Sequence, residues 1–156
     1  MVKISKKIKM INILKKFLDN NNLDGFVIPK NDSYFTEYSK INNLAKLSKF
    51  TGSAGFSLVL KKKNYLFVDG RYTLQANNQC GKFFKIITIP NKMPTDILKG
   101  KKLSIGFDPN LFTERSLLIL FGKTKFKLKP ISQNLIDVIW KRSVIKNNNK
   151  FYLLPN

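Results

Sequence analysis

Two apolar segments separated by three lysines constrain the fold of this chain more than any other feature of its sequence. "GFSLVL" occupies residues 55–60 and "NYLFVD" occupies residues 64–69, with Lys61–Lys63 between them. Short apolar runs that flank a brief polar turn are typical of a β-hairpin. The sequence therefore predicts two buried, antiparallel strands near the middle of the chain.

The segments on either side of this hairpin alternate between strand and helix patterns. Strands are expected over 25–29, 83–89, 102–109 and 126–131. Helices are expected over 10–20, 73–79, 113–122 and 132–141, the last with Leu135, Ile136, Ile139 and Trp140 packed inward. The segments 31–40 and 43–50 are interpreted as short helices or loops. This alternation favours an α/β domain with a mixed β-sheet flanked by helices.

The chain has a large excess of positive charge, for which there are two explanations. Its 156 residues include 29 basic and 9 acidic side chains, and 26 of the basic ones are lysine. Abundant Lys, Asn and Ile are typical of AT-rich coding sequence, whereas phosphate recognition favours arginine forks and interleaved aromatic residues. We therefore favour compositional drift over a nucleic-acid surface, and keep a free-standing domain that binds nucleic acid as the alternative.

The sequence contains no histidine, and this absence excludes several classes of catalytic site. Ser-His-Asp and Cys-His nucleophilic sites are ruled out, as is every metal site that needs an imidazole ligand. Cys80 is the only cysteine, so we interpret it as a small core residue rather than half of an internal disulfide.

The sequence also bears on location. No segment reaches the ~18–20 apolar residues of a membrane span. Lys15 and Lys16 interrupt the apolar run that a signal peptide would need. We therefore expect a cytoplasmic protein without a membrane partner.

The glycine-rich segment "FTGSAGF" (50–56) is a candidate site because Gly52 and Gly55 flank Ser53. A nucleophile elbow needs Gly-x-Ser-x-Gly, but Thr51 stands two residues before Ser53. The sequence has neither a P-loop nor a GxGxxG motif. We interpret this segment as a tight turn in which glycine lets the backbone approach a neighbouring surface.

Three carboxylates, Asp24, Asp69 and Asp108, lie near predicted strand ends, where a two-metal nuclease would need them to converge. We favour turn and cap roles, since Asp accepts local backbone N–H bonds and Gly70 tolerates positive φ.

Arg71 leaves two alternatives open. Its rigid guanidinium holds Asp69 or another carboxylate in a structural ion pair, or it faces a peptide or a neighbouring domain.

Four segments, taken in order, resemble a known family: "DSYFTEY" (32–38), "LAKLSKFTGSAGFSLVL" (44–60), "YLFVDGRYTLQA" (65–76) and "NLIDVIW" (134–140). They are similar to the N-terminal domain of cytosolic Xaa-Pro aminopeptidases (aminopeptidase P), in the creatinase/prolidase superfamily. The order and spacing agree from about Met10 to Trp140, and F-T-G-S-A-G followed by D-G-R-Y is the most specific part. One departure is visible, because Tyr34 stands where the family commonly has histidine.

This resemblance implies a creatinase-type N-terminal domain with a ribonuclease-H-like topology. It also implies that catalysis belongs to a separate "pita-bread" domain, in which two Asp, one His and two Glu hold two divalent metals, usually manganese. Those metals generate the hydroxide that attacks the Xaa-Pro bond. The candidate residues at the substrate cleft or an interface are Gly52, Ser53, Gly55, Asp69, Arg71, Asp32, Tyr34 and Glu37.

We expect three parts in the chain: an N-terminal extension (1–9), a creatinase N-terminal-like domain (10–142), and a linker (143–156) with the truncated first strand of a second, similar domain. Because histidine is absent, we expect this polypeptide to lack the metal site and to be inactive alone. The resemblance implies a role in bounding the substrate cleft and in domain or subunit contacts. The implied partners are a catalytic domain in cis or in trans, a second copy in a homo-oligomer and, in the full enzyme, a proline-containing peptide.

Overall fold

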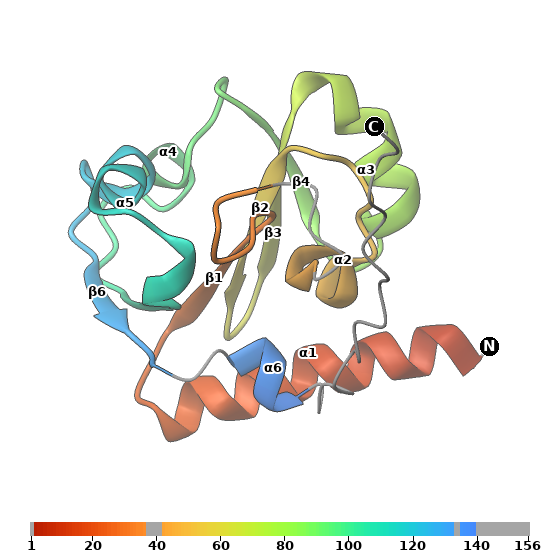
Figure 1. Cartoon of the computed structure of the whole chain (residues 1–156), viewed down its shortest axis with the longest axis horizontal. Helices are drawn as coiled ribbons and strands as arrows, with labels where there is room; N and C mark the ends of the chain where they lie inside the picture. The colour runs from red at the N-terminus through yellow and green to blue at the C-terminus, as the bar shows by residue number, and fades with distance from the viewer. Residues whose placement is uncertain (1, 37–41, 133–134, 140–156) are drawn as a thin grey trace, which may run out of the picture.

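The computed structural model describes residues 2–36, 42–132 and 135–139, and a six-stranded sheet forms its centre (Figure 1). The strand order across the sheet is β4-β3-β2-β1-β5-β6. The strands are β1 (Gly25–Pro29), β2 (Gly55–Leu60), β3 (Asn64–Asp69), β4 (Lys85–Ile89), β5 (Ser104–Phe107) and β6 (Lys127–Pro130). Strand β2 pairs antiparallel with β1 and β3, while the other pairings are parallel. The predicted mixed sheet and its central hairpin are confirmed.

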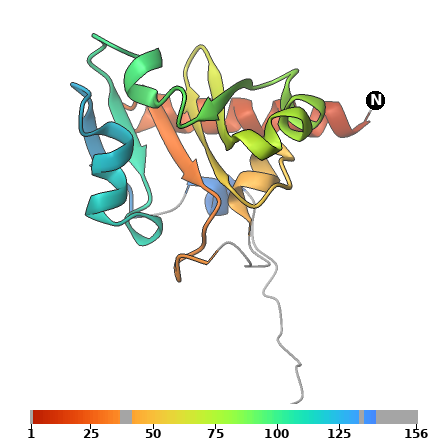
Figure 2. The ribbon, with the colours of Figure 1, turned by 90° about the horizontal axis from the view of Figure 1, so that it is seen from above.

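Helices cover both faces of the sheet (Figures 1 and 2). They are α1 (Val2–Asn20), α2 (Asn43–Ser48), α3 (Thr73–Cys80), α4 (Pro94–Ile97), α5 (Glu114–Phe121) and α6 (Leu135–Ile139). Two 3-10 turns, η1 (Gly70–Tyr72) and η2 (Pro109–Leu111), follow β3 and β5. One apolar core joins the sheet to α1, α2, α3 and α6, and a second joins it to the α4 region and α5.

The central strands are apolar throughout because both of their faces are buried. Along β3, Leu66 and Val68 enter the core beneath α1, whereas Tyr65 and Phe67 enter the core beneath α5. Successive side chains of a strand point to opposite faces, so a continuous apolar run supplies both cores. This is the physical reason why the hairpin sequence is the clearest signal in the chain.

The expected elements are present, with differences at their ends. Helix α1 begins at Val2 rather than Met10 and runs without a break past residue 10. Strand β4 begins at Lys85, because the N–H groups of Phe83 and Phe84 bond to Cys80 O in the turn after α3. The segments 31–36 and 42–50 resolve into a loop followed by the short helix α2.

Helix ends follow the capping chemistry in the sequence. The Thr113 hydroxyl accepts a hydrogen bond from Ser116 N (3.1 Å) and caps the N-terminus of α5, at the start of the helix expected over 113–122. Helix α4 was not predicted, since its four residues are too few for a periodic pattern; it is held by Asp96, which accepts from Met93 N at 2.7 Å.

The C-terminal helix packs as expected where the structure describes it. Leu135 and Ile136 are buried and Ile139 is half-buried against the same core, while Trp140 lies outside the described residues. The proposed boundaries at residues 9 and 142 stay predictions, and 143–156 is also outside the described part. No helix in that part has both the length and the apolar character needed to cross a bilayer.

A matched pair of leucines tests the two-sided core. Leu66 is 0% exposed in β3, whereas Leu74 is 76% exposed on α3. We expect Leu66→Ala to lower the free energy of unfolding by about 2–5 kcal/mol, because it leaves a cavity, and Leu74→Ala to change it by less than about 0.5 kcal/mol. Urea denaturation followed by circular dichroism measures both. Equal stability of the two variants would contradict the buried position of β3.

Candidate functional site

The edge of the sheet at the carboxyl ends of the parallel strands is the first place to look for a site. Strand β1 lies between β2 and β5 in the sheet. The chain continues from β1 to β2 on one side, whereas β5, on the other side, connects to β6, which is farther from β1. In open α/β sheets, ligands bind outside the strand ends where the connections diverge in this way. A groove of about 240 Å³ lies there, lined by Pro29 at the end of β1, by Asn31 just after it, and by Leu111 and Phe112 after β5. The Asn31 amide crosses the gap and donates to Leu111 O at 3.0 Å.

A second, more polar hollow adjoins this groove. It has a volume of about 630 Å³ and is lined by Lys30 and Thr36 on one side and by the Ser53–Gly55 segment on the other. Phe35 lines both the groove and the hollow. The loop after β1 and the glycine-rich segment before β2 therefore form the walls of one recess.

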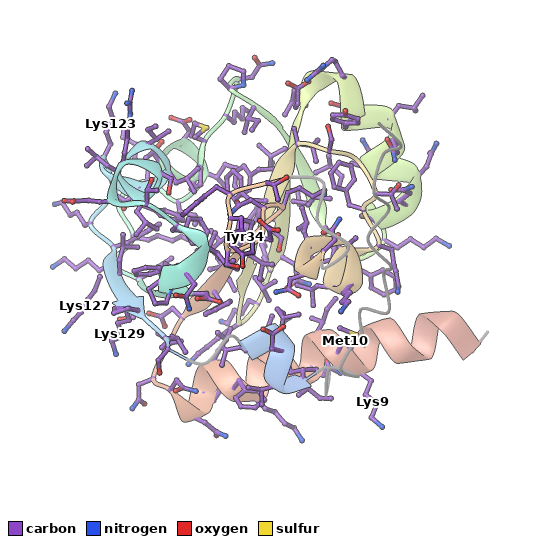
Figure 3. The ribbon with its side chains drawn as sticks, viewed as in Figure 1. Lys9, Met10, Tyr34, Lys123, Lys127 and Lys129 are labelled. Atoms are coloured by element: carbon purple, nitrogen blue, oxygen red, sulfur yellow. The ribbon has the colours of Figure 1, made fainter. Side chains whose placement is uncertain are left out.

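Asp32 shapes the loop after β1. Its Oδ1 accepts hydrogen bonds from Tyr34 N and Thr36 N, each at 3.0 Å. This turn leaves the Tyr34 side chain 87% exposed, in front of the sheet in Figure 3. Asp32 therefore acts on the backbone of its own loop, and Glu37 lies outside the described residues.

The glycine-rich segment is locked to the strand end that carries D-G-R-Y. Ser53 Oγ and Tyr72 OH lie 2.7 Å apart, and the Tyr72 ring packs edge-on against Phe50 at a centroid distance of 6.0 Å. Gly52 sits between these rings, where a Cβ atom would overlap Phe50 and come within 2.9 Å of Tyr72 Cδ1. The glycine is therefore required by close packing, as the sequence predicted for this turn.

Two glutamines of helix α3 also bind the glycine-rich segment, through Thr51. The side-chain amides of Gln75 and Gln79 donate to Thr51 Oγ1 at 2.8 and 2.9 Å, and Thr51 N donates to Gln79 Oε1 at 3.1 Å. Sequence reasoning missed these partners and the role of Tyr72. The one available signal was the four-residue spacing of the glutamines, which places both on one helix face.

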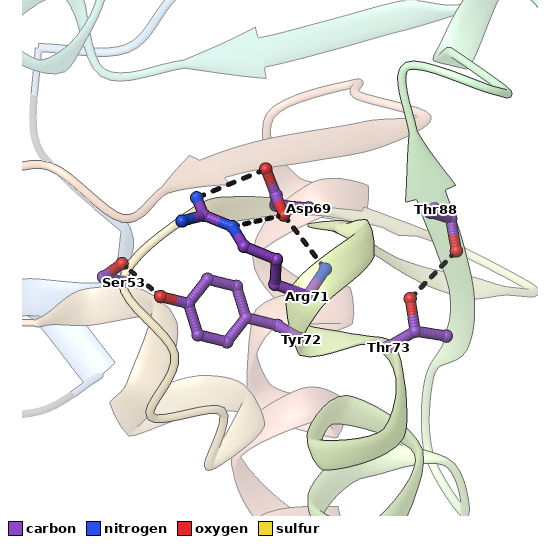
Figure 4. A network of polar contacts seen from close by, with 6 residues as sticks. All are labelled: Ser53, Asp69, Arg71, Tyr72, Thr73 and Thr88. Carbon is purple, nitrogen blue, oxygen red and sulfur yellow. Dashed lines mark hydrogen bonds and ion pairs between the residues drawn. The ribbon is translucent and has the colours of Figure 1, made fainter.

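Arg71 and Asp69 form a local ion pair at the end of β3 (Figure 4). Asp69 Oδ1 accepts from Arg71 N at 3.0 Å and from Arg71 Nε at 2.9 Å. The side-chain bond from Arg71, followed by its backbone bond, lowers the pKa of Asp69 below its ordinary value. The carboxylate is therefore ionised at neutral pH, and any stability that it contributes is lost as the pH falls through that lowered pKa.

The ion pair does not bury the arginine. The Arg71 side chain remains 74% exposed, and its guanidinium carbon lies 5.6 Å from the centre of the Tyr72 ring. Figure 4 shows it beside the Ser53–Tyr72 contact. The arrangement presents an oriented guanidinium that can bind a carboxylate, while the segment's serine has no histidine to activate it.

Asp69 and Gly70 form the expected turn at the end of β3, where Asp69 caps η1. Gly70 does not adopt positive φ, and a Cβ added there would meet only Thr88 Cγ2 at 3.6 Å. Thr73 and Thr88 instead join the start of α3 to β4 through a 3.1 Å hydroxyl contact.

The three strand-end aspartates do not converge on one site, and the turn and cap roles favoured for them are confirmed for Asp69 and Asp108. Asp24 lies before β1, at the opposite edge from Asp69 and Asp108, and its carboxylate accepts from Ser104 N at 2.8 Å. Asp108 accepts from Asn110 N at 2.9 Å and caps η2. Among the described residues, no three His, Cys, Asp or Glu side chains gather closely enough to hold a metal ion. These donors do not fit a two-metal centre.

The two motif glycines give a direct test of the packing. We expect Gly52→Ala to lower the free energy of unfolding by about 1–3 kcal/mol through overpacking against Phe50 and Tyr72. Gly70→Ala should change it by less than about 0.5 kcal/mol, because its Cβ has room. Thermal and urea unfolding of the two variants would decide, and an equal loss of stability in both would contradict the assigned packing.

Comparison with known proteins agrees with this geometry. Residues 10–138 match the creatinase/prolidase N-terminal domain family. A protein of Coprinopsis cinerea named "Probable Xaa-Pro aminopeptidase P" is 32% identical over 93% of this chain, and "Aminopeptidase P1" of Lotus japonicus is 32% identical over 76%. These matches cover 25% and 19% of the two relatives, so the chain spans about a quarter or less of their length.

Solved structures share the fold. The X-prolyl aminopeptidase of Caenorhabditis elegans, described as a cytosolic enzyme with a di-nuclear active site, superposes with a TM-score of 0.76 at 24% identity, over 86% of this chain and 26% of that one. The N-terminal domain of the cytoplasmic peptidase PepQ from Mycobacterium tuberculosis gives 0.65 at 23% identity, over 84% and 98%. The length of the family match and the shared fold lead to one conclusion: this chain belongs to the creatinase/prolidase N-terminal domain family.

Proposed function

We propose that this chain is the non-catalytic N-terminal domain of an Xaa-Pro aminopeptidase-type enzyme, and that it bounds the substrate cleft of a metal-bearing catalytic domain in cis or in trans. The observation that carries the proposal is the locked pair of segments that holds Arg71 exposed at the recessed edge. The names of its relatives supply the parent activity, the release of an N-terminal residue next to proline.

The donor chemistry supports a non-catalytic role for the chain itself. The whole sequence has no histidine, and Asp24, Asp69 and Asp108 are used separately, in a backbone contact, an ion pair and a cap. A two-metal hydrolytic centre needs several ligands that converge on adjacent ions. The metals, expected to be manganese, therefore belong to the partner domain, where they would supply the attacking hydroxide.

The geometry supports a cleft-facing role for the recessed edge. Arg71 is held by its own strand end rather than by the partner, so its guanidinium is oriented before any contact forms. A planar guanidinium binds carboxylates through paired, charge-assisted hydrogen bonds. It can thus contact the carboxylate of a proline-containing peptide or an acidic side chain of the catalytic domain. We place the parent enzyme in the cytoplasm, as its structural neighbours are described.

The purified chain should not hydrolyse an Xaa-Pro peptide in the presence of Mn²⁺, because it lacks a convergent set of metal ligands. Release of the N-terminal amino acid, followed by chromatography, measures this, with a full-length relative as the positive control. Turnover by the 156-residue chain that a chelator abolishes would contradict the non-catalytic assignment.

The cleft-facing role is tested in a chimera in which residues 10–138 replace the matching domain of the Coprinopsis cinerea relative. We expect Arg71→Gln to raise the KM for an Xaa-Pro peptide by about 10-fold or more, the effect of losing one charge-assisted hydrogen bond. The matched control is Lys16→Gln, which neutralises an exposed lysine on α1, outside the recess, and should leave KM unchanged.

The two variants separate a local from a general effect of charge. Equal kinetics for Arg71→Gln, Lys16→Gln and the unmodified chimera would refute the cleft-facing role while leaving the family membership intact. A rise in KM for both variants would assign the effect to net charge rather than to Arg71.

A further inference from the structure

The edge of the sheet opposite the recess is rich in lysine. The β2–β3 turn contributes Lys61–Lys63, and the segment that leads into β5 contributes Lys101 and Lys102. All five side chains are exposed. In Figure 2, the hairpin turn and the loop after β1 lie on opposite sides of the molecule, which shows how far this edge is from the recess.

The two outer strands extend the same feature. Lys82 and Lys85 stand at the start of β4, and Lys125 and Lys127 stand at the start of β6, again with exposed side chains. The positions come from both ends of the strand order, β4 and β6, and from its centre. We call these nine lysines, 61–63, 82, 85, 101, 102, 125 and 127, the basic edge.

Few carboxylates of the described residues pair with the lysines of the basic edge. Of its lysines, Lys61 pairs with Asp19 at 2.9 Å, and no other ion pair to this edge occurs in the part of the chain that the structure describes. The carboxylate of Asp24, which is also at this edge, is used by Ser104 N.

The recessed edge is different, because acidic and basic side chains are mixed there. Asp32 and Asp69 accompany Lys30 and Arg71, and Glu114 is followed by Arg115 at the start of α5. Compositional drift raises the number of lysines in a chain but does not concentrate them at one edge of a sheet.

The shape and chemistry of the basic edge select the kind of anion. Six strands spaced ~4.8 Å apart make an edge that is a line of roughly 24 Å, which matches a linear polyanion better than a membrane plane. The exposed large apolar residues of the described chain lie elsewhere, on the loop after β1 (Tyr34, Phe35), on α3 (Leu74) and on α5 (Leu118, Ile119). The basic edge therefore has no apolar anchor for a bilayer and no aromatic platform for unstacked bases.

An acidic peptide added as a further strand beside β6 is disfavoured by the backbone of that strand. Pro130 has no N–H, and Phe126 N is already bonded to Thr124 Oγ1 at 3.3 Å. The basic edge itself is a row of exposed, compact ammonium groups. Such groups contact phosphates without reading base sequence.

We infer that the basic edge binds the phosphate backbone of double-stranded nucleic acid without sequence preference. This function is separate from the proposed peptidase role and does not depend on it, because it uses the opposite edge of the sheet. Several lysine–phosphate contacts would release condensed counterions, so the affinity must fall steeply as salt is added.

The test compares two triple variants that lose the same charge. Lys62→Gln/Lys101→Gln/Lys127→Gln removes exposed lysines from three parts of the basic edge, and Lys9→Gln/Lys92→Gln/Arg115→Gln removes exposed cations from elsewhere. Figure 3 shows Lys9 and Lys127 on opposite sides of the molecule. Fluorescence anisotropy with a labelled random-sequence DNA duplex of about 25 base pairs, titrated from about 50 to 200 mM salt, gives affinity and salt slope.

We expect the unmodified chain to bind and the edge variant to lose at least about 10-fold in affinity at 50 mM salt, with its log–log salt slope smaller in magnitude by about 2–3. The control variant should keep the slope of the unmodified chain. Equal losses in both variants would overturn the inference in favour of diffuse net charge, as would the absence of duplex binding at about 50 mM salt. Binding to phosphatidylserine vesicles but not to duplex would overturn it in favour of a membrane.

Circular dichroism melts of both variants establish that they are folded before binding is compared. The substituted side chains are exposed, so surface effects within about 0.5 kcal/mol are expected in each.

Discussion

Five of the six strands point the same way, and this shared direction divides the loops of the domain between two edges of the sheet. Only β2 runs in the opposite sense, between β1 and β3. Its reversal brings the glycine-rich segment that precedes it to the edge where β1, β3 and β5 end. Because of that one antiparallel strand, two motifs that are separated along the chain lie side by side, and the lysine-rich turn after β2 is directed to the other edge.

The F-T-G-S-A-G and D-G-R-Y segments are explained by the packing between them. Gly52 is small because two rings close over it, Ser53 is hydroxylic because Tyr72 OH meets it, and Asp69 turns the chain by accepting from Arg71 N. Each of these roles is structural, yet together they fix where one cationic group is exposed. A motif whose contacts are structural can therefore still orient one side chain at the surface, as the proposed function requires of Arg71.

The fold could be predicted from the sequence because the hairpin, the prolines that end strands and the helix caps are local signals. The site could be predicted only in part. Asp69 and Arg71 are two residues apart, so their pairing was accessible, whereas the contacts of Thr51 with Gln75 and Gln79 need tertiary structure. The local turn and cap roles of Asp69 and Asp108 were accessible for the same reason. Strand ends are recognisable in sequence, but the edge at which each lies depends on strand direction, so the separation of Asp24 from the other two needs the structure.

The distribution of charge could not be predicted from the sequence either, and it makes the two edges of the sheet different. The sequence establishes a net charge of +20 but not its distribution, which follows from the topology. Strands of four to six residues separate the two edges by about 13–20 Å at ~3.3 Å per residue. That distance exceeds the Debye length of ~8 Å at physiological ionic strength. An anion at the basic edge would therefore leave the electrostatics of Asp69 and Arg71 nearly unchanged, so that one small domain can present two independent surfaces, a preorganised cation for a partner and a row of lysines for a polyanion.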